Sequence, residues 1–130
     1  MLDVKKLLAK MLSFFKLVRI DVGDQKIYPA NTGWTPTYVS MPDLDKYNMI
    51  YIRAFVKGTV IVMTFPRFDN IDSFAQYFDD TYQNGSSWYF TRLIVRVDWK
   101  NNRVGTSLLN GNLSDKDTYI WGVWGTNKLG

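Results

Sequence analysis

The stretch WYFTRLIVRVDW, residues 88–99, decides the fold of this chain. Its side chains alternate between two faces, and one face is mostly apolar, which is the pattern of a β-strand with one buried side. Tyr89, Thr91, Leu93, Val95, Val97 and Trp99 make up the face that we expect to be buried, and Arg92, Ile94, Arg96 and Asp98 make up the other. Arg92 and Arg96 are suited to bind an anion, but the wet side of a half-buried sheet is the simpler interpretation.

Similar runs precede and follow this strand, and short turn signals separate them. Lys57-Gly58 predicts a two-residue hairpin turn, and Asn101-Asn102 predicts a second tight turn because Asn tolerates positive φ. The predicted strands are NMIYIRAFV (48–56), TVIVMTF (59–65), RVGTSLL (103–109) and TYIWGVWGT (118–126). Several strands with short turns in about a hundred residues predict an all-β fold, a β-sandwich or jelly-roll-like head.

One segment, NIDSFAQYFDD (70–80), fits two interpretations. Ile71, Phe74 and Phe78 have helical spacing, and Asn70 is a suitable N-cap. Every other predicted element of the body is a strand, so we favour a strand here as well.

The N-terminal segment LDVKKLLAKMLSFFKLV (2–18) predicts a short, basic, amphipathic α-helix. Its apolar seam has the 4-3-4-3 spacing of a coiled coil, which favours self-association over packing on its own domain. The seam residues are Val4, Leu8, Met11, Phe15 and Val18. We therefore divide the chain into an amphipathic trimerisation helix (1–20), a neck or loop region (21–47) and a β-sandwich head (48–130).

Composition excludes most familiar catalytic sites. The 130 residues include no Cys and no His, and all 12 acidic residues are Asp. Without His or Cys the chain lacks the commonest general base, the commonest metal ligand and the thiol nucleophile. Asp69, Asp72, Asp79 and Asp80 offer carboxylates for calcium, but the EF-hand spacing is absent. We predict no enzymatic activity, no cofactor and no metal site.

The positive charge is concentrated at the N-terminus. The net charge is +4, and residues 1–20 hold five basic residues and one acid, whereas residues 21–130 hold eleven of each. Because the body has no surplus of positive charge, we predict no nucleic-acid partner. No apolar run approaches the roughly 20 residues needed to cross a bilayer, and no signal-peptide pattern is present, so we predict no membrane insertion.

Three parts of the chain together resemble phage fibre proteins: LDVKKLL near the start, YFTRLIVRVDWKNNRVG (89–105) and the closing YIWGVWG (119–125). The family consists of the small head domains of tail-fibre, baseplate or head-fibre proteins of phages and prophages of Gram-positive gut bacteria. The resemblance implies a homotrimer that binds host cell-surface polysaccharide and other virion proteins. It also implies that the protein is made in the bacterial cytoplasm and resides in the virion.

Aromatic and polar residues in predicted loops are the candidate ligand site. Exposed aromatic rings stack on sugar rings, while Asp and Asn bond to hydroxyl groups. We place the site in the loops around 31–38 and 79–88, at Trp34, Tyr38, Asp79, Asp80, Tyr82, Asn84 and Trp88. Asp79 and Asp80 are adjacent on a strand and point to opposite faces, which argues against a glycosidase pair. We expect Trp99, Trp121 and Trp124 to be buried in the core or in a subunit seam.

The predicted function is therefore a non-catalytic virion fibre or receptor-binding component that recognises a host glycan. One alternative is a purely structural fibre or assembly adaptor that decorates the capsid and binds protein but no sugar. Another is a peripheral membrane protein whose basic helix lies on anionic lipid, although residues 1–20 lack the Trp and Tyr anchors typical of membrane interfaces.

Overall fold

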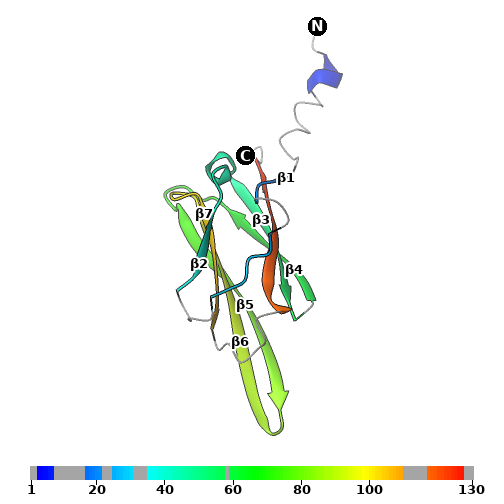
Figure 1. Cartoon of the computed structure of the whole chain (residues 1–130). Helices are drawn as coiled ribbons and strands as arrows, with labels where there is room; N and C mark the ends of the chain where they lie inside the picture. Colours follow the sequence, from blue (N-terminus) through cyan, green and yellow to red (C-terminus); the bar gives the residue numbers. More distant parts are fainter. Residues whose placement is uncertain are drawn as a thin grey trace.

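Two antiparallel four-stranded sheets pack face to face (Figure 1). A computed structural model describes residues 3–7, 17–21, 25–30, 35–57, 59–109 and 117–127, without the side chains of Tyr82, Asn84 and Tyr89. The first sheet has the order β1 (Val18–Arg19), β8 (Tyr119–Thr126), β3 (Met49–Val56) and β4 (Thr59–Pro66). The second has the order β2 (Thr37–Ser40), β7 (Arg103–Leu109), β6 (Ser87–Asp98) and β5 (Ser73–Asn84). The predicted all-β fold with a short N-terminal helix is confirmed.

The alternation in β6 builds one side of the core. Leu93, Val95 and Val97 are buried between the sheets, opposite Ile50 and Ile52 of β3 in the same apolar cluster. The cluster draws its members from five strands of both sheets, so the hydrophobic effect couples the two layers.

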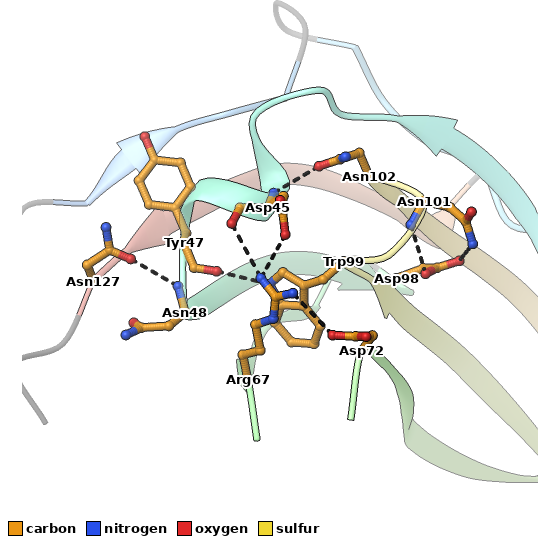
Figure 2. A network of polar contacts seen from close by, with 10 residues as sticks. All are labelled: Asp45, Tyr47, Asn48, Arg67, Asp72, Asp98, Trp99, Asn101, Asn102 and Asn127. Carbon is orange, nitrogen blue, oxygen red and sulfur yellow. Dashed lines mark hydrogen bonds and ion pairs between the residues drawn. The ribbon is translucent and has the colours of Figure 1, made fainter. Parts of the chain in front are cut away.

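Trp99 closes one end of the core, directly after β6. Its ring is fully buried and its Nε1 donates a hydrogen bond to the carbonyl oxygen of Tyr47 at 3.0 Å. Arg67 lies over the ring, 5.8 Å from its centroid, and pairs with Asp45 and Asp72 (Figure 2). The network ties the 3-10 helix η1 (Leu44–Lys46) to the β4–β5 connection.

The predicted N-terminal helix is only partly described, and its end is corrected. Residues 4–7 are helical and stand apart from the sheets, with Val4 and Leu7 exposed (Figure 1). Leu8, Met11 and Phe15 lie outside the described residues. Val18 was predicted to be a helical seam position, and this was wrong: it belongs to β1 and pairs with Gly125 of β8. The backbone of β8 provides hydrogen-bond partners that continuation of the helix would leave unused.

Within the region predicted as a neck (21–47), the described residues 25–30 and 35–47 belong to the sandwich. Ile27 is buried and bridges to Ile120 of β8, and Ala30 bridges to Ser107 of β7. Further along, β2 pairs with β7, and Met41 and Leu44 are fully buried in the core. These residues pair with β8 in one sheet and with β7 in the other, so the backbone groups on that side of each strand do not stay unpaired. The predicted start of the head at residue 48 was therefore too late.

Residues 73–80 of the ambiguous segment form part of a strand, as favoured. β5 pairs with β6 from Ser73↔Asp98 to Asn84↔Ser87 without interruption. The prediction that residues 79–88 form a loop was wrong, because the only turn in that range is at Gly85-Ser86, where Gly85 has a φ of 65°. The hairpin of β5 and β6 extends well beyond the other strands (Figure 1).

Candidate functional site

The protruding part of the β5–β6 hairpin presents a row of aromatic and polar side chains on its outer face. Partners in antiparallel register share a face, and every second residue along a strand returns to it. The register places Tyr77, Asp79, Thr81 and Gln83 of β5 beside Trp88, Phe90 and Arg92 of β6. We call these seven residues the hairpin face.

Three rings of the hairpin face are open to solvent. The exposed fraction is 70% for Trp88, 51% for Tyr77 and 40% for Phe90. Trp88 and Phe90 are two residues apart on one strand face, so they are separated by about 7 Å. Tyr77 lies opposite Ile94, a further four residues along β6, or about 13 Å from Phe90. The rings therefore form an elongated strip and not a pocket.

Arg92 lies between Phe90 and Tyr77 in this strip and contacts Asp79 and Tyr77. Its Nε and Nη2 donate to the two carboxylate oxygens of Asp79 at 2.7 and 2.9 Å. The same guanidinium lies 4.9 Å from the centroid of the Tyr77 ring and so covers one side of it. The hydrogen bonds from Arg92 lower the pKa of Asp79 and raise the pKa of Arg92. Asp79 therefore stays a carboxylate acceptor across the neutral range.

Asp80 points to the other side of the hairpin, as predicted from strand alternation. Its carboxylate pairs with the Lys57 ammonium at 3.0 Å, and both side chains line an open pocket of about 440 Å³. Val56, Thr59 and Phe78 complete the wall of that pocket. Asp79 and Asp80 are thus each engaged with a different cation on a different face, and they do not flank a common ligand.

The structure separates the other predicted site residues. Tyr38 of β2 pairs with Gly105 of β7, at the other end of the sheet from the hairpin tip, and its ring lies 3.7 Å from the Arg103 guanidinium carbon. Trp34 lies outside the described residues. Tyr82 and Asn84 belong to β5 by backbone pairing, but their side chains are not described. Of the seven predicted residues, Asp79 and Trp88 are therefore brought together on the hairpin face.

Sequence reasoning missed Tyr77, Phe90 and Arg92 as members of the site. The signal was present, because residues 77, 79, 81 and 83 share a face as soon as 73–84 is one strand. The prediction of a loop at 79–88 took no account of this alternation. It therefore identified single exposed residues and not a row of side chains on one strand face.

Two of the three tryptophans expected in the core or in a subunit seam lie outside the core. Trp121 and Trp124 are half-buried on the outer face of the first sheet, where Arg53 lies between their rings at 5.2 and 5.1 Å from the centroids. The inner positions of β8 belong to Ile120 and Val123, which are fully buried. Trp99 is buried in the core as expected. Trp121 and Trp124 lie outside the core of this chain, and the alternative expectation that they lie in a subunit seam stays a prediction.

The described residues contain no cluster of three or more Asp side chains that could hold a metal ion. Within the same residues, no helix is long and apolar enough to cross a membrane.

Comparison of the chain with family models, with curated proteins and with solved structures gives no match. Its function is therefore inferred from its residues and their geometry.

Proposed function

We propose that this chain is a non-catalytic receptor-binding component of a phage virion fibre, and that it binds host cell-surface polysaccharide through the hairpin face. The observation that carries the proposal is the exposure of Trp88, Tyr77 and Phe90 in one row on a protruding hairpin. Burying one such side chain is worth about 1.5–3 kcal/mol, so leaving three exposed on one surface favours a ligand that covers them.

An extended glycan suits the chemistry of this row. Sugar rings present C–H faces that stack on aromatic rings, and the strip is long and shallow, as a linear polysaccharide requires. Asp79, Thr81 and Gln83 lie along the same face and offer acceptors and donors for hydroxyl groups. The Arg92–Asp79 pair fixes both side chains in advance, which lowers the ordering cost of binding.

A second candidate is a purely structural virion fibre or adaptor that binds protein and no sugar. The exposure of Val60 and Val62 on the edge strand β4 favours this candidate, because β-branched side chains on a strand edge suit protein contacts better than sugar contacts. In that function the hairpin rings would also pack against protein.

The test is a binding screen of the purified protein against cell walls and polysaccharides of Gram-positive gut bacteria. For a polysaccharide that binds, we expect Trp88→Ala and Tyr77→Ala each to weaken binding by about tenfold or more, since each removes a stacking surface. Phe68→Ala is the matched control, because Phe68 is about as exposed as Tyr77, at 54% against 51%, but lies on the β4–β5 connection.

Equal losses in Phe68→Ala and Trp88→Ala would contradict the assignment of the site. Binding to virion proteins with no binding to any polysaccharide would favour the structural candidate instead.

We further propose that the chain forms a homotrimer through its N-terminal seam. Val4 and Leu7 are exposed and are not covered by the sandwich, which supports self-association of the helix. Replacing Leu8 and Phe15 by Lys should convert the trimer to a monomer and reduce attachment to cells by about 10²-fold or more, while affinity for a soluble oligosaccharide stays unchanged. Light scattering at micromolar concentration measures the oligomer, and a monomeric wild-type protein would refute the proposal.

A further inference from the structure

The outer face of the first sheet carries a second set of aromatic side chains, interleaved with cations. Phe55 of β3 stacks on Tyr119 of β8 with ring centroids 5.0 Å apart, and it meets Trp121 at 5.9 Å. Trp124 continues the row along β8. We call Lys26, Arg53 and these four rings the cation–aromatic ladder.

Arg53 is held in place at the centre of the ladder. Its Nε donates to the carbonyl oxygen of Trp121 at 2.8 Å, opposite an irregularity in the β3–β8 register. Its guanidinium lies 5.2 Å from the Trp121 centroid and 5.1 Å from the Trp124 centroid. The backbone bond uses one donor of the guanidinium and leaves the two terminal amino groups for an acceptor.

Lys26 extends the positive charge to the neighbouring rings. Its ammonium lies 4.8 Å from the Tyr119 centroid and 5.6 Å from the Trp121 centroid, and the side chain is exposed. Lys26 and Arg53 therefore both lie near the Trp121 ring. The Lys26 side chain is exposed, whereas Arg53 is half-buried among the rings.

The charge balance of the ladder differs from that of the rest of the surface. Arg67, Arg92 and Arg103 each form an ion pair with an aspartate, and so does Arg19, which lies over Trp124 at the end of the ladder and pairs with Asp21. Across the part of the chain that the structure describes, neither Lys26 nor Arg53 has a carboxylate partner. Two cations that lie over half-buried rings and have no carboxylate partner among the described residues favour an external anion.

We propose that the cation–aromatic ladder binds a carboxylate-bearing saccharide, with the carboxylate at Lys26 and Arg53 and the sugar ring against Tyr119 and Trp121. The pairing of a fork-shaped guanidinium with a planar carboxylate gives two parallel hydrogen bonds. The adjacent rings provide an apolar surface for the sugar that bears the carboxylate. This site is separate from the hairpin face and does not depend on the function proposed for it.

Two other occupants fit less well. Two-fold pairing of this face would bring Lys26 and Arg53 of two copies together, and like charges about 4 Å apart repel by about 1–4 kcal/mol. A polyol phosphate polymer would satisfy the charges but has no ring to stack on the aromatic side chains. A carboxylated sugar uses both parts of the ladder.

The probes are tetragalacturonate, a hyaluronan tetrasaccharide and sialyllactose, titrated calorimetrically into the full chain at low and at physiological salt. We expect at least one to bind, with affinity that falls as salt rises. Lys26→Gln should weaken that binding about three- to tenfold and Arg53→Met by more than tenfold. Phe68→Ala, on the β4–β5 connection, should leave it unchanged. Because the Lys26 side chain is exposed, the Lys26→Gln variant should fold. Its binding affinity therefore tests the proposal even if the Arg53→Met variant does not fold.

Methyl-esterified tetragalacturonate and polyglycerol phosphate are the matched control ligands. The ester retains the sugar ring without the charge, and the phosphate polymer retains charge without a ring. Failure of all three carboxylated probes, equal binding of the ester, equal binding of the phosphate polymer or an unchanged affinity in Lys26→Gln would each overturn the proposal. Loss of binding in Trp88→Ala would assign the carboxylated sugar to the hairpin face instead.

Discussion

Trp99→Ala should destabilise the fold by about 3–5 kcal/mol, the usual cost of truncating a large buried ring. The Trp99 ring is fully buried, lies 5.9 Å from the Phe74 ring and donates its indole hydrogen to Tyr47. Truncation leaves a cavity and removes the donor for the Tyr47 carbonyl group. Since small domains have only about 5–15 kcal/mol of stability, this single change removes a large share of it. Urea unfolding followed by far-UV circular dichroism gives the free energy of unfolding.

Trp88→Ala is the matched control, because Trp88 lies at the opposite end of β6 and is 70% exposed. It should change the free energy of unfolding by no more than about 0.5 kcal/mol, as surface substitutions usually do. The same chemical change at the two ends of one strand thus separates a structural ring from a binding ring. A loss above 2 kcal/mol in Trp88→Ala would show that its ring is packed in the folded protein and would remove it from the hairpin face.

The fold was largely predictable because burial imposes a period of two on the strands. Val95 and Val97 could be assigned to the inside from the sequence, since a shift of one residue would expose the whole apolar face. The same rule predicted the strand at 70–80 by consistency with its neighbours.

Long-range backbone pairing explains what the sequence did not predict. Residues 21–47 are rich in Gly, Pro, Asn and Asp, which indicates a loop, but Ile27 and Ala30 pair with strands about 77–93 residues away. Val18 also fits the spacing of a helical seam, but its backbone pairs with Gly125 of β8 as part of β1. Neither choice can be decided locally, because the partner strand is supplied by the tertiary fold.

The candidate sites were harder to predict than the fold because ring type does not determine which face a ring occupies. Trp99 is buried and Trp121 lies on an outer face, although both were assigned to strand patterns. The irregularity beside Arg53 shifts the alternation of β8, so that Trp121 and Trp124, three residues apart, share one side. A strict period of two would have placed them on opposite faces.

That irregularity leads to the second large expected effect, at Gly122. Gly122 has a φ of 124°, which L side chains rarely adopt, and a Cβ there would collide with the Trp124 ring. Gly122→Ala should therefore destabilise the fold by about 2–4 kcal/mol, through backbone strain and displacement of that ring. Trp124 is not free to move without loss, because Arg19 and Arg53 lie over it at 5.4 and 5.1 Å.

Gly85→Ala separates the two contributions. Gly85 also has positive φ, at 65°, but nothing lies within 4 Å of the position of a Cβ, so the change should cost only about 1 kcal/mol of backbone strain. The excess cost in Gly122→Ala then measures how tightly Trp124 and the two arginines are held together. Near-UV circular dichroism should change in Gly122→Ala and stay the same in Gly85→Ala, because only the former moves a tryptophan. Equal costs in the two variants would mean that the ring moves aside freely, and that the cation–aromatic ladder is not organised before a ligand arrives.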